Sequence, residues 1–178
     1  MIHEIARLVF SFLCHQDAGS SWGAEGIPAS LCQRCTGMYG GALLALFLFP
    51  LARFRPDTKI LLVHGIFLFQ GALLGMFPIP QPGWIKILSG QLFILGVFYI
   101  LWVNIQSKRR LFKDQASPSL YAAALVLSLL LVQIIVHLPF PFAQSLMDIL
   151  SLLGLVSIFL LSLVTIIALL TSSPPVKE

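Results

Sequence analysis

The sequence predicts an all-α fold, a polytopic helical membrane bundle of about five transmembrane helices with a short amino-terminal helix. The first observation is composition: 58% of the residues are hydrophobic and only 10% are charged, whereas soluble domains are about 25% charged. The second is that long intervals contain no charged side chain. These intervals are 35–52, 60–85, 87–107, 115–147 and 149–176. Each is long enough for the roughly 17–25 residues of a spanning helix.

Turn-forming segments separate the predicted spans. Proline, glycine or basic residues cluster at 53–57, 78–83, 107–110 and 139–141, where they favour turns. The period-two alternation of a barrel strand is absent. The connections are short, so we expect one integral membrane domain over residues 1–178. The spans are placed at about 36–52, 60–77, 85–104, 119–138 and 147–170.

The first 13 residues are helix-like but too short to cross a bilayer. Ile2, Ile5, Leu8 and Phe12 recur at helical spacing, with polar residues between them. Such a segment is typical of a helix that lies at the membrane interface. We therefore expect residues 1–13 to form an interfacial or half-inserted helix, and a sixth, shallow span stays open.

Lysine and arginine predict the orientation. Alternating the loops places eight of these residues on one side of the membrane and Arg34 and Lys86 on the other, while Arg7 is not assigned to either side. The positive-inside rule then makes loops 53–59 and 105–114 cytoplasmic and directs the loop 14–35 outward. The formal net charge of +4 is thus a topology signal. No basic face with stacking aromatic residues indicates a nucleic-acid partner, and the expected partner is the lipid bilayer.

All three cysteines lie in the predicted outward loop. Cys14 and His15 are followed, after 16 residues, by Cys32-x-x-Cys35. Sulfur and imidazole ligands with a C-x-x-C arm are typical of four-coordinate zinc. We predict a zinc site formed by Cys14, His15, Cys32 and Cys35. If either Cys14 or His15 only supports the site, a fourth position is open to water or substrate.

Two other functions use the same cysteines. Cys32-x-x-Cys35 beside Arg34 is a setting that can lower a thiol pKa and permit disulfide exchange. The alternative is therefore a membrane thiol–disulfide oxidoreductase with Cys14 as the partner thiol. The third hypothesis is a non-enzymatic accessory subunit of a larger membrane complex, in which the cysteines tie the amino-terminal helix down. Without any function, the small cysteines would simply pack at a helix end. A partner in a membrane complex and a homo-oligomer both stay open.

The cysteine motifs also carry a resemblance. Cys14-His15-Gln16, followed by the run from Cys32 to Gly41, resembles the signature of a family of small predicted prokaryotic membrane proteins with no assigned function. That signature is Cys-His-Gln, a short loop, then Cys-x-Arg-Cys-[Ser/Thr]-Gly running into a helix. The match lies mainly in residues 13–41 and is weaker to about residue 90. His64 stands there in place of an Asp, and Lys86 in place of an Arg.

The resemblance implies a prokaryotic plasma membrane protein with one site around these motifs. Its implied members are Cys14, His15, Gln16, Cys32, Arg34 and Cys35. Two further residues fall on the outward side: Lys86, which could snorkel or attract an anion, and His137, which could be an extra ligand or proton shuttle, or have no role. Helical rise places His64 some 20 Å from the cysteines, so we do not expect it to be a ligand.

Residues within the spans give three packing expectations. Gln70, Gln91 and Gln133 should bond across helices, because unpaired polar groups are costly in a bilayer. Two G-x-x-x-G pairs, Gly37/Gly41 and Gly71/Gly75, should bring the first and second spans together. Asp148 should open the last span as a carboxylate at the positive end of the helix dipole.

Overall fold

The computed structural model of the protein describes residues 2–14, 21–24, 27–51, 58–76, 80–109, 118–136, 138 and 142–171. Within these ranges the chain forms six helices and one small sheet. The helices are α1 (Ile2–Ser11), α2 (Gln33–Leu51), α3 (Thr58–Met76), α4 (Gly83–Arg109), α5 (Pro118–Val136) and α6 (Phe142–Leu170). The helical bundle is confirmed. The sheet, which the sequence did not predict, is an antiparallel hairpin of β1 (Ser21–Ala24) and β2 (Ile27–Cys32).

Three helices are long and apolar enough to cross a membrane. They contribute the stretches Gly83–Val103, Ser119–Val136 and Phe142–Leu170, while α3 has a shorter apolar stretch, Thr58–Leu74. Their outer faces carry many exposed aliphatic and aromatic side chains, as expected for helices in contact with lipid. The membrane character of the protein is therefore supported, and the count of five spans stays a prediction.

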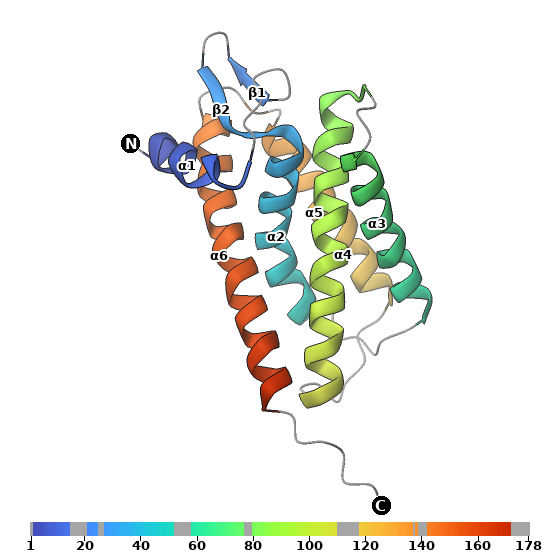
Figure 1. The fold of residues 1–178 in the computed structure, drawn as a ribbon. Coiled ribbons are helices and arrows are strands. Elements are labelled where there is room, and N and C mark those ends of the chain that lie inside the picture. The colour runs from blue at the N-terminus through green and yellow to red at the C-terminus, as the bar shows by residue number, and fades with distance from the viewer. Residues whose placement is uncertain are drawn as a thin grey trace, which may run out of the picture.

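The long helices lie side by side along one direction (Figure 1). Helix α4 is central: it packs against α2 on one side and α3 on another, and α2 in turn packs against α6. The hairpin and α1 gather at the end of the bundle where α2, α4 and α6 begin, and α1 lies across that end (Figure 1). We call this end of the molecule the hairpin end. There α1 contacts both α6 and β2.

Glycines allow the closest helix contacts. A Cβ atom on Gly37 would lie 1.9 Å from the carbonyl oxygen of Ile87, and one on Gly90 would lie 2.0 Å from that of Arg34. These positions join α2 to α4. Gly71 of α3 likewise faces Phe93 of α4. The expectation that the glycines join the first two spans was therefore wrong. The glycine surfaces of α2 and of α3 both pack against α4.

Glutamines connect neighbouring helices, as predicted. The side-chain amide of Gln70 donates to the Ser89 carbonyl at 3.2 Å, and that of Gln91 to the Ser128 carbonyl at 2.6 Å. Gln133 donates to the Trp84 carbonyl at 3.3 Å. Each bond joins α4 to α3 or α5, because lipid cannot satisfy these amides.

His64 belongs to a separate aromatic cluster. Its ring stacks on Tyr99, with centroids 4.0 Å apart, and its Nε2 is hydrogen-bonded to the hydroxyl of Tyr121. Its Nδ1 lies 2.8 Å from the Ile60 carbonyl oxygen. The imidazole is fully buried, so it holds α3, α4 and α5 together.

Candidate metal centre

Three thiols from three chain segments converge at the hairpin end. Cys14 follows α1, Cys32 is the last residue of β2, and Cys35 lies in the first turn of α2. Their Sγ atoms all lie within 4.8 Å of one another. None of them is in a disulfide. Residues that are distant in sequence thus form one group of three sulfur donors.

The end of α1 directs Cys14 into the site. The Phe10 carbonyl accepts hydrogen bonds from the amides of Leu13 at 3.0 Å and Cys14 at 2.8 Å, so the chain closes a tight turn there. Phe10 is fully buried, and its ring packs 5.0 Å from that of Tyr39 on α2. This anchor fixes the position of the turn, and Cys14 becomes part of the apolar cluster around Phe10 and Tyr39.

The start of α2 brings Cys32 and Cys35 together. Cys32 immediately precedes the helix, and the hydroxyl of Thr36 donates to its carbonyl at 3.1 Å. The residue before a helix and the third residue within it face one another, as in a capping box. This geometry explains why a C-x-x-C pair at a helix start presents both sulfurs on one side. The positive end of the helix dipole lies there and favours negative charge.

Neighbouring sulfurs and burial control the protonation of these thiols. The pKa of Cys32 is raised above 9.0, chiefly by the hydrogen bond with Cys14, while Cys35 acts in the opposite direction. The pKa of Cys35 is also raised, chiefly by its hydrogen bond with Cys14 and then by that with Cys32. Three thiolates this close repel one another. Without a cation between them the thiols therefore stay protonated.

The structure describes two of the predicted supporting residues, Arg34 and Lys86. His15, Gln16 and His137 lie outside the described residues. Arg34 directs its guanidinium to the end of α3, where Nη2 donates to the Leu74 carbonyl at 2.7 Å, and its buried Nε has no hydrogen-bond partner among the described residues. Lys86 lies in the first turn of α4, at the hairpin end.

A second polar cluster at the hairpin end was missed by sequence reasoning. Asp148 is buried, and its carboxylate accepts a hydrogen bond from Ser30 of β2 and lies 2.9 Å from Nδ1 of His3 on α1. The amide nitrogen of Gln144 is also 2.9 Å from that Nδ1. The expectation that Asp148 opens the last helix was wrong, because α6 begins six residues earlier, at Phe142. The missed signal is Gln144, Asp148 and Ser151, spaced to share one face of an otherwise apolar helix.

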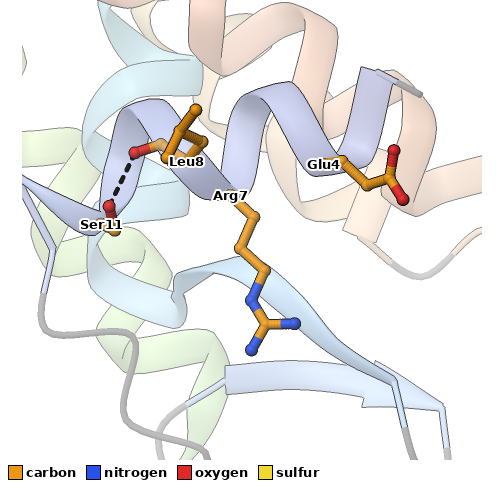
Figure 2. A pocket seen from close by; sticks show the side chains of 4 residues that line it. All are labelled: Glu4, Arg7, Leu8 and Ser11. Atoms are coloured by element: carbon orange, nitrogen blue, oxygen red, sulfur yellow. Dashed lines mark hydrogen bonds between the residues drawn. The ribbon is translucent and has the colours of Figure 1, made fainter.

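Two more features complete this end of the molecule. The hydroxyl of Ser151 is fully buried and makes no hydrogen bond to any residue that the structure describes. A pocket of about 320 Å³ lies on α1, lined by Glu4, Arg7, Leu8 and Ser11. Figure 2 shows that Arg7 extends from α1 toward the hairpin. The hydroxyl of Ser11 donates to the Leu8 carbonyl at 2.7 Å, and Glu4 is the one carboxylate among these four lining residues.

Comparison with known proteins supports the membrane character of the chain. Residues 14–100 match the family described as predicted membrane protein, DUF2085. That range includes the three cysteines. The chain is also 35% identical over 52 residues to the uncharacterized protein MJ1492 of Methanocaldococcus jannaschii, a stretch that covers 29% of this chain and 33% of the relative. The similarity therefore spans about a third of the relative's length. No solved structure matches the chain.

Proposed function

We propose that this protein is an integral membrane protein whose outward-facing site binds a transition metal, with zinc as the preferred ion. The observation that carries the proposal is the convergence of Cys14, Cys32 and Cys35, whose sulfurs lie within 4.8 Å of one another. Sulfur donors this close together match the ligands of a tetrahedral zinc site. His15, which directly follows Cys14 in the sequence, is the proposed fourth ligand.

The surroundings of the sulfurs favour a divalent ion. Three thiolates and one neutral imidazole around a divalent ion carry a net charge of minus one. Around a monovalent ion the same ligands would carry a net charge of minus two. Cys14 is buried in an apolar cluster, where each uncompensated charge is costly, so the smaller charge is preferred. The positive end of α2 adjoins Cys32 and Cys35 and further stabilises a negative metal–thiolate group.

A buried donor near the site is consistent with a bound group. Gly154 of α6 closely approaches the Tyr39 carbonyl of α2, and the two helices run in the same direction (Figure 1). Ser151, one turn before Gly154, is therefore level with the turn of α2 that contains Cys35. Buried hydroxyls nearly always have a partner. The Ser151 hydroxyl, which has no partner among the described residues, is thus suited to donate to a water molecule or to a metal-bound ligand.

The proposed topology has five spans, α2 to α6, with the hairpin end outside. Helix α6 has 29 residues, about 43 Å at 1.5 Å per residue, against a hydrocarbon core of roughly 30 Å. Its polar first turns can therefore stand above the hydrocarbon beside the cysteines. Helix α3 begins at the opposite end of the bundle (Figure 1), and Lys59 is its second residue. The positive-inside rule favours a basic residue next to a cytoplasmic loop.

Metal analysis of the detergent-purified protein tests the proposal. We expect about one zinc per chain, loss of the metal with a strong chelator, and three thiols that react with an alkylating reagent only after its removal. After the metal has been removed from intact cells, a membrane-impermeant reagent at alkaline pH should reach these thiols from outside. Protein that holds no metal, while its three thiols are free and reactive from the start, contradicts the proposal.

The oxidoreductase hypothesis is less favoured by the site. A catalytic dithiol needs a stabilised thiolate, whereas neighbouring sulfurs and burial raise the pKa of both Cys32 and Cys35. Thiol trapping followed by mass spectrometry separates the two functions. A Cys32–Cys35 or Cys14–Cys35 disulfide that cycles with reductant in cells would favour redox chemistry.

A further inference from the structure

One buried carboxylate connects the two chain segments that supply Cys14 and Cys32. The side chain of Asp148, on α6, is only 4% exposed. One of its oxygens accepts a hydrogen bond from the Ser30 hydroxyl, and the other lies 2.9 Å from His3 Nδ1. We propose that Asp148 is a positioning residue of the cysteine site, which through Ser30 and His3 holds β2 and α1 so that their sulfurs meet. The inference deepens the proposed metal function and rests on it.

The bond to Ser30 fixes the strand that ends in Cys32. Ser30 lies two residues before Cys32 on β2. Alternate residues of a strand share one face and are about 6.6 Å apart. Ser30 is 1% exposed, so water does not compete for its hydroxyl. Holding Ser30 on α6 therefore restricts both the register and the tilt of the strand next to Cys32.

The contact with His3 fixes the helix that ends before Cys14. His3 is the second residue of α1, and the ten residues of α1 make a rod about 15 Å long. Phe10 anchors the other end of the rod against Tyr39. Gln144, one turn before Asp148 on α6, also contacts the His3 ring. With both ends held, α1 cannot pivot, and Cys14 stays beside the other sulfurs.

The order of the three groups argues for positioning and against nucleophilic catalysis. In a Ser-His-Asp triad the imidazole stands between the hydroxyl and the carboxylate. Here the carboxylate stands in the middle, with Ser30 on one oxygen and His3 on the other. The Ser30 hydroxyl therefore bonds directly to the carboxylate, and the His3 imidazole does not stand between them. A buried carboxylate is costly unless it is paired, and these two contacts compensate that cost.

The first arm of the test uses metal-free protein and the rate at which each cysteine is alkylated. Asp148→Asn keeps the size of the side chain and removes its charge. Loss of the charge-assisted contacts should speed the alkylation of Cys14 and Cys32 by about tenfold or more. Ser157→Ala is the matched control, because Ser157 is buried on the same helix and, among the described residues, its hydroxyl donates to the Leu153 carbonyl one turn earlier. Its rates should equal those of the unchanged protein.

The second arm measures the binding of Co²⁺, a spectroscopic substitute for Zn²⁺. In Asp148→Asn the dissociation constant should rise by about 10–100-fold. The absorption spectrum at saturation should be unchanged, because Asp148 is not a ligand. His3→Gln keeps a donor for the carboxylate and should lose less affinity than His3→Ala. A general loss of stability would give no such difference between the two His3 variants.

The outcomes separate this inference from the proposed function. Unchanged alkylation rates and unchanged Co²⁺ affinity in Asp148→Asn overturn the inference, even if the protein binds metal. If the unchanged protein binds no metal, the proposed function fails, and the alkylation arm still decides whether Asp148 holds the two segments. Ser30→Ala removes the bond between Asp148 and β2 and leaves the contact between Asp148 and His3 in place. If Asp148→Asn does not fold, Ser30→Ala decides alone. Alkylation that speeds up more at Cys32 than at Cys14 supports the inference, and unchanged rates overturn it.

Discussion

The backbone amide of Cys32 lies 3.4 Å from the sulfur of Cys14 and donates a hydrogen bond to it. The two residues are 18 positions apart in sequence, and the bond joins the end of β2 to the turn after α1. A hydrogen bond to sulfur stabilises its thiolate form and also orients a metal-bound thiolate. This contact therefore favours the thiolate form of Cys14 that the proposed metal site requires.

Replacing any one of the three cysteines by serine should greatly weaken metal binding. A direct ligand contributes more than an outer-shell partner, so the dissociation constant for Co²⁺ should rise by more than about 100-fold. The thiolate-to-Co²⁺ absorption per bound metal should fall by about one third, because one of three sulfurs is lost. Titration against a competing chelator gives the affinity, and the absorption spectrum counts the thiolates.

Met38→Leu is the control for the cysteine variants. Met38 carries a sulfur and packs against the same apolar cluster, but a thioether is not among the predicted ligands. Its replacement should leave both affinity and spectrum unchanged. A Cys→Ser variant that behaves like Met38→Leu would remove that cysteine from the ligand set.

The alkylation of Cys32 in metal-free protein should require alkaline pH. The hydrogen bond with Cys14, followed by burial, raises its pKa above 9.0. A raised folded-state pKa means that folding favours the protonated thiol. This contribution to stability is present below pH 9.0 and is lost as the pH rises through the folded value. The alkylation rate should therefore have its midpoint above pH 9.0, and the unfolding temperature should fall over the same range. A midpoint below pH 9.0 would instead favour the oxidoreductase hypothesis.

Alanine at two glycines should destabilise the bundle. A Cβ on Gly37 would lie 1.9 Å from the Ile87 carbonyl oxygen, and one on Gly154 would lie 1.8 Å from that of Tyr39. Both obstacles are backbone atoms, so the helices must move apart, at a cost of about 1–3 kcal/mol or more. Gly65→Ala is the control, because nothing lies within 4 Å of its added methyl. That control should be neutral or stabilising, since alanine favours helix. Thermal unfolding in detergent measures all three.

The sequence predicts the helices better than their partners. A long charge-free interval is enough to indicate a helix. A glutamine such as Gln70 inside a span must find a hydrogen-bond partner in the protein. Both expectations depend only on the local sequence. The glycine pair Gly37/Gly41 indicates a close approach without indicating which helix approaches. That partner, α4, follows from the packing of the whole bundle.

The cysteine group was predictable from spacing, whereas its support was not. Cys32 and Cys35 lie around a helix start, and this local geometry suffices to bring their sulfurs together. Asp148 was misplaced because the start of its helix was read from the charge itself, although Pro141 marks an earlier start, at Phe142. The hairpin that carries Ser30 is short and contains Pro28 and Gly23. Its pairing therefore depends on contacts with α1 that the sequence does not reveal.

Helix α1 and the turn that follows it should contact protein through Phe10 and lipid through Phe12. The two side chains lie two residues apart, yet Phe12 is 83% exposed and Phe10 is fully buried. Ile5 and Leu8 are exposed as well, and an amphipathic helix with such a face binds at the membrane interface. A photoreactive phenylalanine at position 12 should therefore cross-link to phospholipid in vesicles, and the same group at position 10 should cross-link within the chain, to α2. Cross-links from position 12 to protein alone would show that another subunit covers α1, as the accessory-subunit hypothesis requires.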